Sequence, residues 1–109
     1  MTIPSFSSMF SSMFYPTLLF LNDDQIHNID DLEEFCAEYF NVSKEDQQER
    51  IPSGLKKFRN GIQWGISYLK KGKLIEQSAR GKYKITSIGK NRIAHGEVYF
   101  NEHSLILMH

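Results

Sequence analysis

Six polar side chains that could contact DNA lie on one side of the helix expected at residues 55–71. At about 100° per residue, they share an arc roughly 100° wide without acidic or apolar side chains; they are Lys56, Arg59, Asn60, Gln63, Ser67 and Lys70. Lysine and arginine can donate to guanine acceptors, and asparagine or glutamine can make a two-pronged contact with adenine in the major groove. This helix face is therefore a candidate recognition surface for double-stranded DNA.

Three more basic residues follow in a segment whose pattern predicts a β-hairpin. The expected strands are 74–77 and 82–86, joined by a tight connection at 78–81. Arg80, Lys82 and Lys84 alternate along this segment, so Lys82 and Lys84 share one face of the second strand. They could neutralise phosphates beside the helix.

The charged residues are distributed unevenly along the chain. Its net charge is zero, from 13 basic and 13 acidic residues. Residues 21–50 hold ten acids against two bases, whereas residues 51–92 hold eleven bases against Glu76 alone. Such asymmetry is typical of a surface that meets a polyanion. The competing interpretation is that the two regions neutralise each other across the fold.

Several helices are expected around these basic elements. An amphipathic helix is predicted at 6–14, and Pro16 either kinks it or restarts a helix with proline in the first turn. Asp30, with a glutamate three residues later, predicts the start of an acidic helix that runs to about Phe40. Ser43 is expected to cap a short polar helix, and the turn at 51–54 ends it.

The order of elements predicts a mainly α fold with a small β-hairpin, namely a winged helix-turn-helix. The 55–71 helix is expected to end at Gly72, and Thr86 and Ser87 are expected to cap a last helix through about Ala94. A chain of 109 residues supports about one domain, which we assign to 1–96. The apolar tail at 97–109 packs back on the domain, pairs with another chain, or begins a following segment.

The remaining faces of the 55–71 helix are expected to pack inside the fold. Its core face is predicted to consist of Leu55, Phe58, Ile62, Ile66 and Leu69. Trp64 and Tyr68 are expected to pack against the N-terminal helix rather than stack on bases. Gly61 and Gly65 each cost about 1 kcal/mol relative to alanine inside a helix. We expect them to permit a close helix crossing, although Gly61 could instead admit a DNA backbone.

No catalytic, metal or cofactor site is predicted. The four histidines are scattered and lack metal-ligand spacing, and there is no glycine-rich phosphate loop. Glu33, Glu34 and Glu38 are interpreted as a solvated helix face, and Cys36 as a buried residue. With one cysteine, no internal disulfide is available, which favours a cytoplasmic location. Neither a signal peptide nor a membrane helix is expected.

The combined motifs resemble the N-terminal domain of Mrr-type restriction endonucleases. The resemblance covers about residues 3–95 and rests on Ile3-Pro4-Ser5, Pro16, Leu19, the run 51–54, Phe58, Asn60, Trp64, Tyr68 to Lys71, Leu74-Ile75, Arg80-Gly81, Tyr83, Ile85-Thr86 and Gly89. It implies a bacterial winged-helix domain that binds DNA and delivers a separate nuclease domain in defence against modified foreign DNA. Two features depart from the family pattern: Gly61 replaces a usual arginine, and the nuclease half is not in these 109 residues.

Two classes of function follow from the sequence. The first is a double-stranded DNA-binding module, the targeting domain of a restriction or defence system, without catalytic activity of its own. A small transcription regulator would be another DNA-binding protein of the same fold. The second class is a protein-interaction or dimerisation module that uses the acidic helix at 30–40 or the tail at 97–109. Its partner would be a second copy or a downstream nuclease domain.

Overall fold

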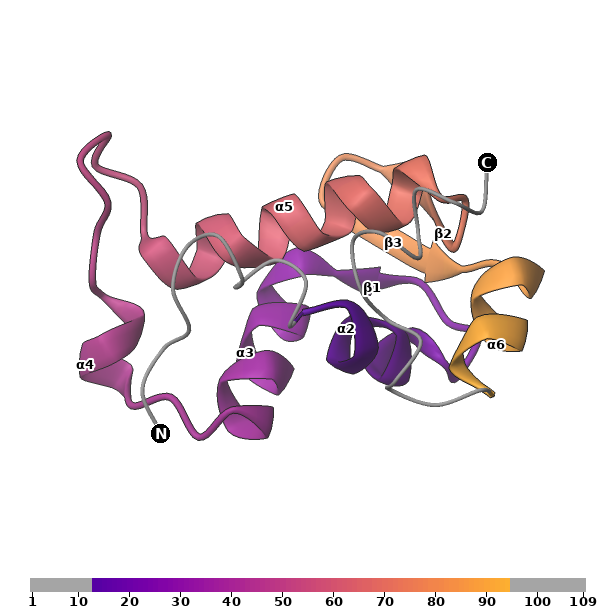
Figure 1. Cartoon of the computed structure of the whole chain (residues 1–109), viewed down its shortest axis with the longest axis horizontal. Coiled ribbons are helices and arrows are strands. Elements are labelled where there is room, and N and C mark those ends of the chain that lie inside the picture. The colour runs from indigo at the N-terminus through magenta and orange to yellow at the C-terminus, as the bar shows by residue number, and fades with distance from the viewer. Residues whose placement is uncertain (1–12, 95–109) are drawn as a thin grey trace.

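The computed structural model describes residues 13–94, so the tail at 97–109 and most of the helix predicted at 6–14 lie outside the described residues. The described helices and strands follow the order α2 (Phe14–Leu21), β1 (His27–Asn28), α3 (Ile29–Tyr39), α4 (Lys44–Gln47), α5 (Lys57–Lys71), β2 (Ile75–Ala79), β3 (Lys82–Ile85) and α6 (Ser87–Ile93). Figure 1 shows α5 as a long helix running past α3, with the hairpin at its far end.

The hairpin belongs to a three-stranded antiparallel sheet with the order β1-β3-β2. Ile75 pairs with Ile85 in the hairpin, and His27 of β1 pairs with Tyr83 on the other side of β3. The predicted mainly α fold with a small hairpin is confirmed, and the arrangement is compatible with a winged helix-turn-helix. Strand β1 was not predicted, because two residues are too few to show the alternation that marks a strand.

The core lies between α2, α3, α5 and the inner face of the sheet. Its fully buried side chains include Phe14 and Leu18 of α2, Leu32 of α3, and Phe58 and Ile62 of α5. Helix α2 packs against both α3 and α5. Because α2 touches both α3 and α5, its apolar residues set the separation between these two helices.

Most of the predicted core face of α5 is confirmed, but Leu55 is a correction. Phe58, Ile62, Ile66 and Leu69 are buried, whereas the Leu55 side chain is 53% exposed. The helix starts at Lys57 rather than at residue 55, so Leu55 belongs to the preceding turn and does not follow the helical period. The glycines at 61 and 65 are both buried, which agrees with their expected role in close packing.

The two aromatic residues of α5 differ in their environment. The Tyr68 ring lies 6.2 Å from that of Phe14, which confirms the expected packing against the start of the chain. Trp64 is 46% exposed, so it is not fully buried, and its expected packing against the helix predicted at 6–14 lies largely outside the described residues. Trp64 lies on the edge of the apolar stripe, where helical periodicity alone does not decide whether a large side chain is covered.

Helix capping follows the sequence with one shift. Ser43 and Thr86 cap α4 and α6 as predicted, by accepting from the backbone N–H groups of Asp46 and Gly89. The N-cap of α3 is Asn28, two residues before the predicted Asp30, and its side chain accepts from the N–H of Asp31 at 2.9 Å. Asn28 ends β1, so the strand leads directly into the helix.

Proline and glycine mark the ends of two other helices. Pro16 lies in the first turn of α2, which selects the predicted restart over a kink. Helix α5 ends at Lys71, and Gly72 is its C-cap as expected. The left-handed backbone that follows belongs to Lys73, with φ of 64°.

Cys36 is fully buried in α3, as predicted. Burial raises the pKa of its thiol to about 12, so the thiolate is scarce at neutral pH.

Gly89 holds α6 close to the junction between α5 and β2. A Cβ atom at this position would lie 2.2 Å from the Leu74 carbonyl oxygen and 2.7 Å from Ile85 Cγ1. The same Leu74 oxygen accepts from the Thr86 backbone N–H at 3.0 Å and from its hydroxyl at 2.9 Å. Because these partners are fixed, a side chain at position 89 would force α6 outward.

We expect Gly89→Ala to lower the free energy of unfolding by about 1–3 kcal/mol, measured by urea denaturation. Alanine is the better helix former by about 1 kcal/mol, so a net loss would report the steric clash. Ser87→Ala, in the exposed first turn of the same helix, should stay within about 0.5 kcal/mol of the wild type. A Gly89→Ala variant as stable as Ser87→Ala would contradict the close approach.

Candidate nucleic-acid interface

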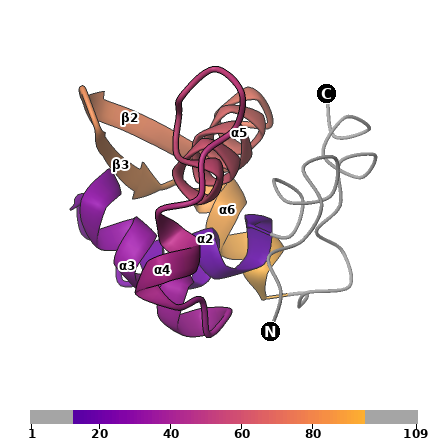
Figure 2. The same cartoon turned by 90° about the vertical axis from the view of Figure 1, so that its left-hand side faces the viewer.

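Helix α5 and the β2-β3 hairpin share one side of the domain. Figure 2 shows α5 and both strands in the upper part of the view, and α3 and α4 below them. Three of the predicted contact residues on α5 are exposed: Gln63, Ser67 and Lys70.

A hydrogen bond joins the end of α5 to the hairpin. Lys70 Nζ donates to Gln77 Oε1 at 2.7 Å. The ammonium has three donor hydrogens, so this bond fixes the side chain and leaves two donors for a ligand. The bond also fixes the position of β2 relative to the exposed face of α5.

The alternation predicted for the second strand of the hairpin is confirmed. Tyr83 and Ile85 are buried, whereas Lys82 is exposed and Lys84 is half-buried on the opposite face. Lys84 Nζ lies 4.0 Å from an Asp24 carboxylate oxygen. Among residues 13–94, neither Arg80 nor Lys82 has a carboxylate within ion-pair distance.

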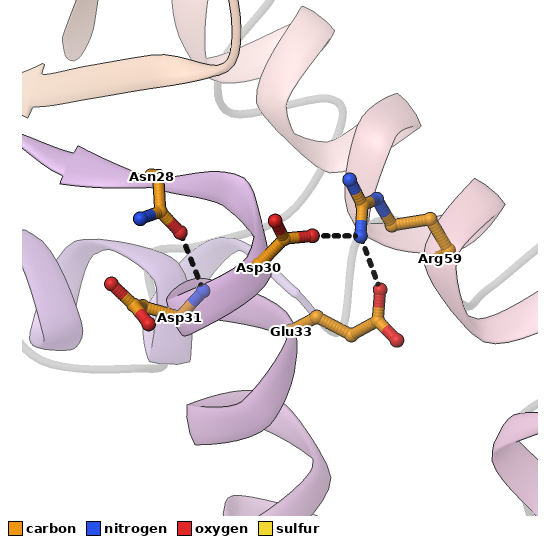
Figure 3. Close-up of polar contacts among 5 residues, drawn as sticks. All are labelled: Asn28, Asp30, Asp31, Glu33 and Arg59. Atoms are coloured by element: carbon orange, nitrogen blue, oxygen red, sulfur yellow. Dashed lines mark hydrogen bonds and ion pairs between the residues drawn. The ribbon is translucent and has the colours of Figure 1, made fainter.

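Arg59 joins α5 to α3. Its Nη1 atom donates to Asp30 Oδ1 and to Glu33 Oε1, both at 2.8 Å (Figure 3). Although burial lowers the pKa of the guanidinium, its hydrogen bonds to Glu33 and Asp30 hold that pKa above its usual value. Two carboxylates of α3 already accept from Arg59, and a contact of this residue with DNA stays a prediction.

The prediction that Glu33 is solvated is wrong, because this residue takes part in the same ion pair. It was assigned to a solvated face with Glu34 and Glu38, but its side chain is only 16% exposed and pairs with Arg59. Glu34 and Glu38 are more exposed and line a cleft of about 680 Å³ between α3, α4 and the start of α5. Lys56 lines the same cleft and is half-buried, so it faces the acidic side of the domain.

Asn60 lies on the predicted arc but is only 8% exposed. It lines one shallow hollow together with Gln63, Trp64 and Ser67. Trp64 is one turn along the helix from Asn60, and long side chains of a helix lean towards its N-terminus. A two-pronged contact of Asn60 with adenine stays a prediction, and Gln63 is the exposed amide of the arc.

The sequence missed two exposed cations at the end of α5. Lys71 was placed outside the arc, and Lys73 was not assigned to any surface, yet both are exposed beside Lys70 and the hairpin. The cluster of basic residues around Gly72 was the signal that could have found them. We use the name α5–wing surface for the exposed residues of α5 and of the segment that follows it, together with the half-buried Lys84: Gln63, Ser67, Lys70, Lys71, Lys73, Arg80, Lys82 and Lys84.

Residues 13–94 contain neither a metal-binding group nor a membrane span. No group of three or more histidine, cysteine or acidic side chains in this range could hold a metal ion. None of the described helices has the length and apolar character needed to cross a membrane.

Replacing Arg59 with methionine should lower the free energy of unfolding by about 1–2 kcal/mol, because Glu33 would lose a charged partner in a partly buried position. Lys71→Met removes the same charge from an exposed site on the same helix and should change stability by less than about 0.5 kcal/mol. Chemical denaturation of both variants compares them directly. Equal losses in the two variants would show that the pair with α3 contributes nothing measurable.

The comparisons with known proteins support one family. The family model described as the Mrr N-terminal domain matches residues 10–95, which is most of the chain. No curated protein matches significantly, and no solved structure does. The match includes every helix and strand described above. The chain therefore belongs to the Mrr N-terminal domain family.

Proposed function

We propose that this domain binds double-stranded DNA through the α5–wing surface and acts as the targeting domain of a restriction system. In this role it has no catalytic activity of its own, and a nuclease domain elsewhere would cut the DNA. Family membership supports the link to restriction, and the proposal of DNA binding rests on the charge distribution of the fold.

The observation that carries the proposal is the separation of charge between the two sides of the domain. The acids of α3 and α4 lie below α5 in Figure 2, and two of them, Asp30 and Glu33, pair with Arg59. The exposed cations at the end of α5 and on the hairpin lie on the other side. Their charge is therefore available to a polyanion although the net charge of the chain is zero.

In this proposal the hairpin of the α5–wing surface contacts phosphates, and helix α5 contacts bases. Lys82 and Arg80 are exposed and would contact phosphates, which fix the position of a protein on DNA. Gln63 is an exposed amide in the middle of α5 and could read an adenine edge. Since Asn60 is nearly buried, we assign base recognition to Gln63 and its neighbour Ser67.

A protein-interaction role is the second candidate, and one observation favours it. Tyr39 of α3 is 38% exposed, and its ring lies 6.3 Å from that of Phe35 on the same helix. Partly exposed aromatic side chains next to Glu34 and Glu38 are suited to a protein partner. This surface belongs to α3 and α4, so it leaves the α5–wing surface free.

DNA affinity should fall steeply with salt, because each neutralised phosphate releases a counterion. Lys82→Ala should reduce the slope of log K against log salt concentration by about 0.9. Lys44→Ala, which removes the same charge from α4, should leave the slope unchanged. Fluorescence anisotropy with a labelled duplex at several salt concentrations measures both variants. Equal slopes for the wild type and Lys82→Ala would remove the hairpin from the interface.

A further inference from the structure

Helix α5 is longer than the groove that it would enter. Its 15 residues span about 22 Å at about 1.5 Å per residue. The major groove of B-DNA is about 12 Å wide. A helix of this length extends past one or both walls of the groove, and its ends come close to the sugar-phosphate backbones. The hairpin lies at the C-terminal end of α5, and residues 50–56 lie at the other end.

Residues 50–56 form a projecting loop, which we call the 50–56 loop. In Figure 1 its tip rises above the start of α5, on the same side as the turn of the β2-β3 hairpin. In Figure 2 the tip again lies at the top with α5 and the hairpin, while α3 and α4 lie below. The two views agree that the loop and the hairpin flank α5 on the side opposite the acidic helices.

Local hydrogen bonds hold this loop in one conformation. The Ile51 N–H donates to the Leu55 carbonyl and the Gly54 N–H to the Ile51 carbonyl, each at 2.9 Å. Gly54 adopts φ of 93°, which favours glycine. The Arg50 guanidinium donates to the Gly54 carbonyl and closes the turn. A loop already fixed in this way loses little conformational entropy when it binds.

The chemistry of the loop fits phosphate rather than protein or metal. Arg50 is exposed, and among the described residues no carboxylate lies within ion-pair distance of it. Its guanidinium has further N–H donors besides the one that binds Gly54. Ser53 is exposed at the tip, and hydroxyl groups commonly contact DNA phosphates. The chain contains no acidic residue between Arg50 and Ile75.

We propose that the 50–56 loop is a second contact with the phosphate backbone, at the opposite end of α5 from the hairpin. This inference rests on the proposed DNA binding and adds to it a two-sided grip. The hairpin would hold one wall of the groove and the loop the other. Contacts at both ends would prevent α5 from sliding along its own axis relative to the DNA, which the hairpin contact alone would not do. The run Ile51-Pro52-Ser53-Gly54, which the α5–wing surface leaves without a role, provides the rigid tip.

A charge placed at the tip tests the proposal. Ser53→Glu should weaken binding to a labelled duplex at least tenfold, whereas Gln48→Glu should change it by less than twofold. Both positions are exposed and both changes add one negative charge, but Gln48 follows α4 outside the loop. Thermal unfolding monitored by circular dichroism verifies that both variants are folded. Equal affinities for the two variants, with the wild type still binding, would overturn the second contact.

A second variant is expected to bind DNA more tightly than the wild type, a result that a loss of folding could not produce. Ser53→Lys should tighten binding severalfold and steepen the salt dependence, because a new cation would meet a phosphate. No change in affinity or salt dependence in Ser53→Lys would overturn the proposal.

Ethylation interference then separates the inference from the proposed function. The wild type should show two groups of essential phosphates, one on each wall of the groove; Ser53→Glu should lose one group and Lys82→Ala the other. A single group, lost in Lys82→Ala and kept in Ser53→Glu, would leave DNA binding intact and exclude the loop. No binding by the wild type would remove the proposed function itself.

Discussion

The ion pair between Arg59 and two carboxylates of α3 is the constraint on which the functional face depends. Helices α3 and α5 both pack against α2, whose apolar side chains separate them. Apolar packing is not directional, so it does not by itself fix the rotation of one helix relative to the other. One guanidinium nitrogen held by two oxygens at 2.8 Å is directional and supplies that orientation. Because Arg59 lies on the same arc of α5 as Gln63 and Lys70, this pairing also fixes the direction in which that arc faces.

This pairing also explains how a chain with no net charge can present a basic surface. Acidic residues outnumber basic ones in the segment that forms α3 and α4, but part of that acidity is used inside the fold. Asp30 and Glu33 pair with Arg59, and Asp24 pairs with Lys90 at 2.9 Å. The pKa of Asp24 is lowered mainly by its hydrogen bond with Lys90. Among residues 13–94, the cations without a carboxylate within ion-pair distance include Lys70, Lys71 and Lys73 at the end of α5, and Arg80 and Lys82 of the hairpin.

Local sequence patterns predicted the helices, strands and caps well, but they predicted the contacts between these elements less well. Periodicity identified the buried face of α5, which consists of Phe58, Ile62, Ile66 and Leu69. The spacing of apolar residues within a single helix is enough to predict which of them share a face. Capping by Ser43 and Thr86 was predictable because the donor and acceptor lie three residues apart. The burial of Arg59 and Asn60 was not predictable, because it depends on side chains that are distant in the sequence or packed around the helix. Glu33 lies 26 residues from Arg59 in the chain, and no local pattern encodes that contact.

The contact at Leu74 also determines how the domain responds to force. Its carbonyl oxygen accepts two hydrogen bonds from Thr86, and Gly89 lies directly against it. The end of α5, the base of the hairpin and α6 therefore form one stiff unit. A force applied to the hairpin would displace α6 as well, with little change in the structure between them. Helix α6 and the hairpin would therefore move together.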